Sequence, residues 1–279
     1  MKAWDVISNP DVFCRVRNLR TCATVKDMSK KAMPENFSDL KSESFQTSER
    51  QQYVAKLFDS LAPKYDRFNR WVSLFRDESW RRHTIAFLQE RAAGRILDLA
   101  AGTGDLARCA AASAASEVHV FDISFEMLAL AKAKLAGQNS FAGKIAIEQG
   151  SANLLPFKNQ SFDGIVSGFA MRNVFHFLDE VLLEMTRVLK PGGRFAILEL
   201  SRPANPILRF VFNLHMKTIM PLIGRFTTGE SEPFNYLHQT TMTFLTPAEF
   251  KDRLIQAGFV DVAFKKYLFG GIAIHYGSK

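Results

Sequence analysis

The chain has 279 residues, of which 47% are hydrophobic and 23% charged, and this globular composition excludes a disordered or fibrous protein. No apolar run reaches the roughly 18 residues of a transmembrane helix. Its three cysteines, Cys14, Cys22 and Cys109, have no metal-ligand or redox spacing, which excludes a disulfide scaffold and a structural zinc site. The net charge of +8 leaves three interpretations: an ordinary basic surface, a nucleic-acid partner or an anionic membrane face.

The first part of the chain, residues 1–49, is polar and has no clear hydrophobic period, so we expect a flexible N-terminal extension. Its arginines would suit a transit peptide, but acidic residues at positions 5, 11 and 27 count against organellar targeting. The segment also lacks the continuous apolar core of a secretory signal, which argues against secretion. Residues 50–279 are expected to form one domain.

A helical pattern begins at residue 52 and is expected to end where Pro63 breaks it. Strands and helices then alternate. Apolar runs predict strands at 95–99, 118–121, 145–147, from 164 onward and at 195–200, and amphipathic segments predict helices at 106–115, 125–135 and 180–189. The sequence Lys-Pro-Gly-Gly at 190–193 is a strong helix stop.

Residues 202–245 interrupt this alternation, which resumes at a capping box formed by Thr246 and Glu249. A helix to Ala257 and strands at 260–266 and 272–276 complete the chain. The whole pattern predicts an α/β fold with a doubly wound, mostly parallel sheet of seven strands and a helical cover inserted at 202–245. Such sheets bind ligands at the carboxyl ends of their strands.

A glycine loop joins the first strand to its helix, in the sequence Asp-Leu-Ala-Ala-Gly-Thr-Gly-Asp at 98–105. Gly102 and Gly104 also satisfy the dinucleotide fingerprint, so an NAD-dependent oxidoreductase is one interpretation. However, Asp98 and Asp105 would repel a pyrophosphate, whereas they suit the ammonium and sulfonium of S-adenosylmethionine. Asp122, at the end of the second strand, can accept hydrogen bonds from a ribose diol with either cofactor.

Four motifs give the chain a resemblance to the ubiquinone/menaquinone biosynthesis C-methyltransferases, which are class I S-adenosylmethionine enzymes. The resemblance covers residues 52–279. The motifs are Tyr-Asp-x-Phe-Asn-x-x-Val-Ser at 65–73 with Trp80, the glycine loop, Phe-Ala-Met-Arg-Asn-Val at 169–174, and Arg-Val-Leu-Lys-Pro-Gly-Gly at 187–193.

The resemblance implies which residues bind the cofactor. They are Thr103, Asp122, Ser151, Ala152 and Gly168, in addition to Asp98, Gly102 and Gly104 of the loop. The chain departs from the family at four positions, where the family usually has Met, His, Asn and Ser, and this chain has Phe68, Asp77, Ser151 and Gly168.

The implied activity is that of EC class 2.1.1, methylation of a ring carbon of a prenylated quinol: demethylmenaquinol or 2-polyprenyl-6-methoxy-1,4-benzoquinol. Removal of a quinol proton makes the adjacent carbon nucleophilic, so the enzyme must align its substrates and help remove that proton. Arg172, with Asn173 and Tyr65, is the catalytic candidate, unless Arg172 only pairs with an acidic residue. His176, His215 and His238 are alternative bases. Tyr236 resembles a further position near the substrate, and no metal is implied.

The inserted segment between Ser201 and Gly229 has four basic residues and no acidic one among many aliphatic and aromatic residues. This pattern predicts an amphipathic cover that touches an anionic membrane; a core helix packed on the sheet is the alternative. We expect a cytoplasmic, peripherally membrane-associated enzyme that binds no nucleic acid, and a homo-oligomer is compatible with the resemblance. A non-catalytic cofactor-binding scaffold is a further alternative.

Overall fold

The computed structural model describes residues 47–73, 75–227 and 232–279. The extension expected at 1–49 lies outside the described residues except for 47–49, where the first helix begins. None of the described helices is both long and apolar enough to cross a membrane.

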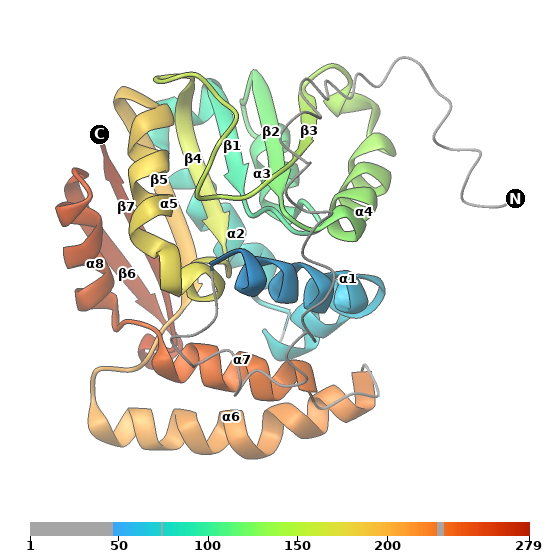
Figure 1. Cartoon of the computed structure of the whole chain (residues 1–279), viewed down its shortest axis with the longest axis vertical. Helices are drawn as coiled ribbons and strands as arrows, with labels where there is room; N and C mark the ends of the chain where they lie inside the picture. Colours follow the sequence, from blue (N-terminus) through green and yellow to red (C-terminus); the bar gives the residue numbers. More distant parts are fainter. Residues whose placement is uncertain (1–46, 74, 228–231) are drawn as a thin grey trace, which may run out of the picture.

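A seven-stranded sheet forms the centre of the fold, with the strand order β3-β2-β1-β4-β5-β7-β6 (Figure 1). Strands β3 to β5 are mutually parallel, while β7 runs antiparallel to both β5 and β6. The doubly wound, mostly parallel sheet predicted from the sequence is therefore confirmed. The strands are β1 (Arg95–Leu99), β2 (Glu117–Asp122), β3 (Ile145–Gln149), β4 (Phe162–Gly168), β5 (Leu189–Leu200), β6 (Val260–Tyr267) and β7 (Ile272–Ser278).

Eight α-helices surround this sheet in the described part of the chain. They are α1 (Thr47–Val72), α2 (Asp77–Ala86), α3 (Asp105–Ala112), α4 (Phe125–Ala136), α5 (Leu178–Val188), α6 (Pro206–Thr227), α7 (Glu232–Thr243) and α8 (Pro247–Gln256). A 3₁₀-helix, η6 (Met171–Phe177), connects β4 to α5. The predicted cap of α4 forms, with the Ser124 hydroxyl accepting from the Met127 N–H, and so does the capping box of α8.

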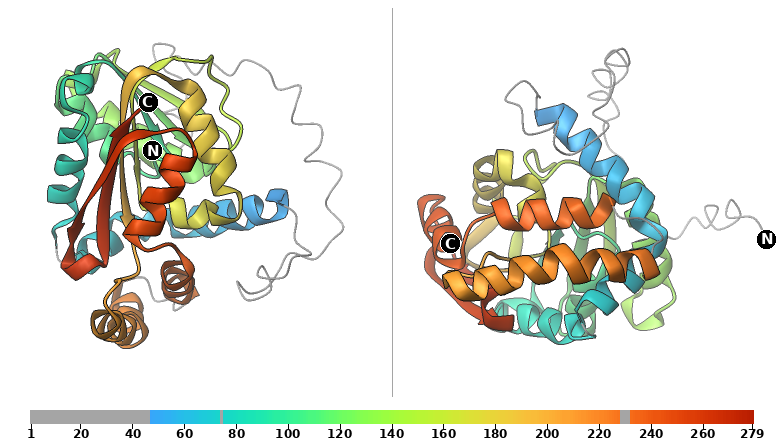
Figure 2. Two further views of the ribbon diagram at one scale, coloured as in Figure 1. Left: turned by 90° about the vertical axis from the view of Figure 1, so that its left-hand side faces the viewer. Right: turned by 90° about the horizontal axis from the view of Figure 1, so that it is seen from below.

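Helices cover both faces of the sheet, as the edge-on view in Figure 2 shows. The fully buried Leu97 of β1 belongs to a cluster with side chains of α5 and α8, whereas its neighbour Ile96 belongs to a cluster with side chains of α3 and α4. This alternation follows from the period of two along a strand. Burial on both faces explains why the parallel strands appear in the sequence as continuous apolar runs.

Helices α1, α6 and α7 lie together across one end of the sheet, below it in Figure 1. Phe68 and Val72 of α1 and Leu200 of β5 pack against a buried cluster contributed by α6 and α7, comprising Met216, Met220, Phe234 and Leu237. The segment 202–245, in which the sequence predicted a helical cover, therefore holds α6, α7 and their connections.

Two expectations about element ends were wrong. Pro63 does not end the first helix but lies inside α1. Proline lacks the N–H that would bond the carbonyl four residues earlier, yet α1 continues because Phe68 and Val72 beyond it are packed against the cover. The Lys-Pro-Gly-Gly segment does follow the end of α5, but it belongs to β5, which begins at Leu189 rather than near Phe195.

Candidate active site

The glycine loop connects β1 to α3 and forms the floor of the site. Three of its residues have left-handed backbone conformations: Ala100 (φ 54°), Gly102 (φ 55°) and Gly104 (φ 76°). A Cβ on Gly104 would lie 3.1 Å from the Cβ of Ala131 on α4, so glycine is needed there for close helix packing as well as for its φ. The loop thus turns sharply at the carboxyl end of β1, as a ligand-binding loop in this fold requires.

A cavity opens above this loop, at the edge of the sheet where ligands bind in this fold. Its walls come from the ends of β1, β2 and β4, from η6 and from α1, which brings together residues far apart in the sequence. The lining residues are Val54, Phe58, Tyr65, Ala100, Gly102, Phe121, Asp122, Ile123, Met127, Gly150, Ser151, Ala152, Gly168, Phe169, Ala170, Asn173, Val174 and Phe177.

A second, smaller cavity adjoins the first and shares Tyr65, Ala100, Gly102, Gly168 and Phe169 with it. Its other lining residues differ in character, because several of them are charged or polar: Arg81, Asp98, Thr103 and Asp105, with Ala101 and Leu106. The two cavities form one elongated cleft with a mostly apolar end and a charged end.

Asp122 lies in the first cavity at the end of β2. Its Oδ2 accepts the Gly102 N–H at 2.7 Å and its Oδ1 accepts the Ser124 N–H at 2.8 Å. Burial raises the pKa of Asp122, while these backbone N–H groups oppose that rise. Each carboxylate oxygen can accept more than one hydrogen bond, so Asp122 retains capacity for a ribose diol.

Asp98 lies in the second cavity and is fully buried. Its Oδ2 accepts the Ala107 N–H at 2.7 Å, but its Oδ1 has no hydrogen-bond partner among the described residues. Burial raises the pKa of Asp98 to about 7, and the nearby carboxylates of Asp122 and Asp105 act in the same direction. An unpartnered buried carboxylate oxygen is costly, so this atom is suited to a cationic ligand group.

The other residues expected to bind cofactor lie along the same cleft. Thr103 lines the charged end, and Gly168 lines both cavities. Ser151 and Ala152 line the apolar end, where the Ser151 hydroxyl donates to the Asn153 side chain at 2.6 Å. A Cβ on Gly168 would lie 2.9 Å from the Cδ1 of Leu106, so a larger residue here would require that side chain to shift.

Two of the three catalytic candidates line the apolar end of the cleft, namely Tyr65 from α1 and Asn173 from η6. The Tyr236 hydroxyl of α7 donates to the Asn173 Oδ1 at 3.0 Å and so orients that amide. Burial raises the pKa of Tyr65, whereas the positive charges of Arg172 and Arg81 oppose the rise.

Arg172, the third candidate, lies behind this wall and does not line either cavity. It is buried, and its Nη1 forms an ion pair of 2.7 Å with Glu199, which is itself fully buried. The same Nη1 donates to the Phe169 carbonyl, and the Nε has no hydrogen-bond partner among the described residues. The structural pairing that the sequence left as an alternative is therefore present. Arg172 acts on the cleft through its charge, which also lowers the pKa of Tyr236 against the larger effect of burial.

The three histidines considered as bases lie away from the cleft. His176 follows Phe175 in η6 but is exposed, and His215 is exposed on α6. His238 on α7 contacts the Asn213 Oδ1 at 2.7 Å. None of them lines the cavities formed by the described residues.

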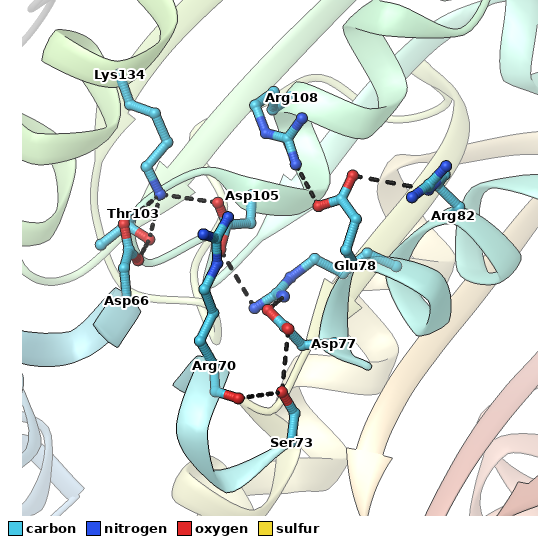
Figure 3. A network of polar contacts seen from close by, with 11 residues as sticks. Asp66, Arg70, Ser73, Asp77, Glu78, Arg82, Thr103, Asp105, Arg108 and Lys134 are labelled. Carbon is cyan, nitrogen blue, oxygen red and sulfur yellow. Dashed lines mark hydrogen bonds and ion pairs between the residues drawn. The ribbon is translucent and has the colours of Figure 1, made fainter. Parts of the chain in front are cut away.

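Sequence reasoning missed the polar contacts that hold α1 against the loop. The Thr103 hydroxyl donates to Asp66 of α1 at 2.6 Å, and Lys134 of α4 contacts Asp66 at 2.7 Å and Asp105 at 2.8 Å (Figure 3). Two turns earlier in α1, Asp59 accepts from the Ser124 hydroxyl. The partners are separated by 29 or more residues in the chain, and no local pattern marks such pairs.

These residues fit S-adenosylmethionine, the cofactor that the resemblance implies. The unpartnered Asp98 oxygen suits its ammonium, Asp122 suits its ribose, and the backbone at Gly102 and Gly168 is open to close approach. Asp98 and Asp105 both lie at the charged end of the cleft. A pyrophosphate at the start of α3 would meet both carboxylates, which disfavours a dinucleotide.

Comparison with known proteins gives a consistent result. The sequence model of the "ubiE/COQ5 methyltransferase family" matches residues 46–279. A "Demethylmenaquinone methyltransferase" of Symbiobacterium thermophilum is 37% identical over 238 residues, covering 83% of this chain and 94% of the relative. A "Ubiquinone/menaquinone biosynthesis C-methyltransferase UbiE" of Desulfotalea psychrophila is 37% identical over 227 residues, covering 81% and 90%.

Solved structures share the fold at low sequence identity. The "[4+2]-Cyclase SpnF" gives a TM-score of 0.60 at 18% identity and covers 82% of this chain and 96% of that one. A phosphoethanolamine N-methyltransferase 2 of Haemonchus contortus, in complex with S-adenosyl-L-methionine, gives 0.53 at 16% identity, covering 72% and 52%.

Proposed function

The chain belongs to the ubiE/COQ5 methyltransferase family, and from that premise we propose that it methylates a ring carbon of a prenylated quinol, with demethylmenaquinol as the first candidate substrate. It is an S-adenosylmethionine-dependent C-methyltransferase of quinone biosynthesis. Several relatives carry the name demethylmenaquinone methyltransferase, which favours the naphthoquinol over 2-polyprenyl-6-methoxy-1,4-benzoquinol.

The observation that carries the substrate proposal is the character of the cleft beside the cofactor residues. The larger cavity has an apolar wall formed by Phe58, Phe169, Val174 and Phe177. Besides Asp122 and Ser151, the polar side chains in this cavity are those of Asn173 and Tyr65. An aromatic ring with one hydroxyl to be oriented fits such a wall.

The chain's own residues then have separable tasks. When bound, S-adenosylmethionine supplies an electrophilic methyl group on a sulfonium. Asn173 and Tyr65 would orient the quinol hydroxyl, whose deprotonation moves negative charge onto the adjacent ring carbon. Arg172, buried behind them, would stabilise the quinolate through its charge. After the carbon is methylated, loss of its ring proton restores aromaticity.

The rival functions lack support. An NAD-dependent oxidoreductase is disfavoured by the two carboxylates at the charged end of the cleft, and the relatives are methyltransferases. A non-catalytic scaffold would not require Tyr65 and Asn173 to line the cleft next to the cofactor residues, as they do.

We further propose that the outer face of α6 contacts an anionic membrane surface that carries the quinol. Its exposed side chains are mostly apolar, and Ile207 (73% exposed) and Phe210 (68% exposed) are the most accessible of Ile207, Phe210, Val211, Leu214, Ile219 and Leu222. Arg209 and Lys217 lie on the same helix, which has no acidic residue. An apolar face with basic neighbours is typical of helices that lie in a membrane interface.

The substrate proposal is tested by incubating the protein with methyl-labelled S-adenosylmethionine and each of the two demethylated quinols in turn. We expect label in the naphthoquinol product at the higher kcat/KM. An Asn173→Ala variant should lower kcat without weakening cofactor binding, because Asn173 is assigned to the quinol hydroxyl and not to the cofactor. Labelling of neither quinol by a protein that binds the cofactor would refute the proposal.

A further inference from the structure

The charged end of the cleft contains a cation to which nothing above assigns a task. Arg81 of α2 is 5% exposed and lines the second cavity together with Asp98 and Asp105. An uncompensated buried charge is strongly unfavourable, and Arg81 is compensated within the chain by Asp77 and Asp105.

Two carboxylates hold Arg81 in place without using all of its donors. Its Nη1 forms an ion pair with Asp77, whose other oxygen accepts the Ser73 hydroxyl at 3.0 Å. Its Nη2 lies 3.3 Å from the Asp105 Oδ2, a longer contact. Figure 3 shows Asp77 and Asp105 at the centre of this network. A guanidinium has five N–H donors, so Arg81 can bind a further anion while Asp77 orients it.

Asp105 also has a second cation. Lys134 contacts its Oδ1 at 2.8 Å. Although burial opposes it, Arg81 and Lys134 together hold the pKa of Asp105 below its usual value. If Arg81 turned one N–H from Asp105 toward a ligand, Lys134 would still compensate the Asp105 charge.

The position of the two cavities indicates which part of the cofactor lies here. Asp122, suited to the ribose, and Ser151 line the first cavity, and Gly102 lies at the junction of the two. The part of S-adenosylmethionine beyond its ribose is an α-amino acid with one ammonium and one carboxylate. The second cavity offers one unpartnered carboxylate oxygen, on Asp98, and one cation with spare donors.

We propose that Arg81 binds the α-carboxylate of the methionyl part of S-adenosylmethionine, while Asp98 binds the ammonium of the same part. This assignment rests on the cofactor placement given under the proposed function. It makes Arg81 a cofactor-binding residue and Asp77 the residue that positions it.

The test compares S-adenosylmethionine with decarboxylated S-adenosylmethionine, which keeps the sulfonium and the amine but lacks the carboxylate. Calorimetric titration should show that the wild-type protein binds the intact cofactor about 10- to 100-fold more tightly, the range expected for a charge-assisted pair. In Arg81→Met this ratio should fall to about 1, with Arg81→Lys between the two.

The matched control is Arg82→Met on the same helix, because the Arg82 side chain is 71% exposed and lines neither cavity. It should keep the wild-type ratio. If Arg81→Met does not fold, Arg81→Lys and the wild-type protein still give the two ratios needed.

Equal affinity of the wild-type protein for both ligands would overturn the proposal, and so would an unchanged ratio in the Arg81 variants. The outcome is separable from that of the substrate proposal, because it is read from binding alone. A collapsed ratio in a protein that methylates neither quinol would support Arg81 and refute the quinol.

Discussion

The ligand cleft and the outer face of α6 differ in which side chains they bury and which they expose. In and behind the cleft, Asp98, Arg172 and Glu199 are buried; Asp98 accepts the Ala107 N–H, and Arg172 pairs with Glu199. On the outer face of α6, large apolar side chains such as Phe210 are exposed instead. Buried charges with defined partners indicate a preorganised polar site, whereas an exposed apolar face indicates a surface that something else covers. We therefore propose that separate elements carry the chemistry and the proposed membrane contact.

The largest effect is expected from breaking the buried pair at the cleft. Arg172→Met leaves Glu199 fully buried without its cation, which should lower the free energy of unfolding by about 3–5 kcal/mol. Chemical denaturation measures this loss. In the double variant Arg172→Met/Glu199→Gln, the amide oxygen can still accept the backbone N–H groups that Glu199 now accepts, so most of the stability should return, but methyl transfer should not.

If the double variant methylated quinol at the wild-type rate, Arg172 would have only its structural role. If it recovered no stability, the ion pair would not be what makes Arg172 necessary for folding.

The next effect concerns cofactor binding. Asp122→Ala removes the carboxylate expected to accept the ribose diol, and the affinity for S-adenosylmethionine should fall by about 100-fold or more, since hydrogen bonds to charged groups are among the strong ones. Calorimetry measures the affinity, and a thermal melt shows whether the variant is folded. Glu117→Gln, at the other end of β2, is the control and should bind normally. A folded Asp122→Ala protein with normal affinity would remove Asp122 from the site.

A smaller, graded effect is expected from pH. Burial raises the pKa of Asp98 to about 7, and a bound ammonium would favour its ionised form. Cofactor affinity should therefore weaken as pH falls below about 7, approaching tenfold per pH unit. Calorimetry between about pH 5.5 and about pH 8, on both sides of that pKa, would detect the change. Asp98→Asn should bind more weakly at high pH and lose most of this pH dependence.

The same shift has a consequence for the ligand-free protein. Between about pH 4 and about pH 7 the folded state keeps the Asp98 proton, whereas the unfolded chain, in which the pKa of Asp98 is about 3.9, has released it. This contribution to stability is therefore present at low pH and is lost as pH rises from about 4 to about 7.

The cofactor-affinity measurement decides the role of Asp98. If the affinity of the wild-type protein for S-adenosylmethionine did not change with pH, Asp98 would not be the ammonium site.

The smallest effect is expected at the outer face of α6. Replacing both Ile207 and Phe210 with Ser removes two exposed apolar side chains, and binding to vesicles that contain phosphatidylglycerol should weaken by about tenfold. Methylation of a water-soluble, short-chain quinol should stay unchanged. Leu183→Ser, at an equally exposed apolar position on α5, is the control. Equal losses in the control and the α6 variant would mean that the face has no special role.

The contrast between the cleft and the outer face of α6 also explains what the sequence could predict. The strands and the glycine loop follow from local signals, namely apolar runs, Gly102 and Gly104, and a cap at Ser124, and all of these appear in the structure. The continuation of α1 past Pro63 could not be predicted from the sequence, because the packing of Phe68 and Val72 overrides the tendency of proline to end a helix. The partners of Arg81 and Arg172 could not be predicted either. Asp105 and Glu199 are brought to them only by the tertiary fold.

The most direct test of the account follows the methyl group itself. The protein is incubated with S-adenosylmethionine carrying a trideuterated methyl group and with demethylmenaquinol, and the product is examined by mass spectrometry and NMR. We expect a product with a trideuteromethyl group bonded to a ring carbon and unmodified hydroxyls, and no product from Asp122→Ala at the same cofactor concentration. A label on a hydroxyl oxygen, or no transfer by a protein that binds the cofactor, would contradict it.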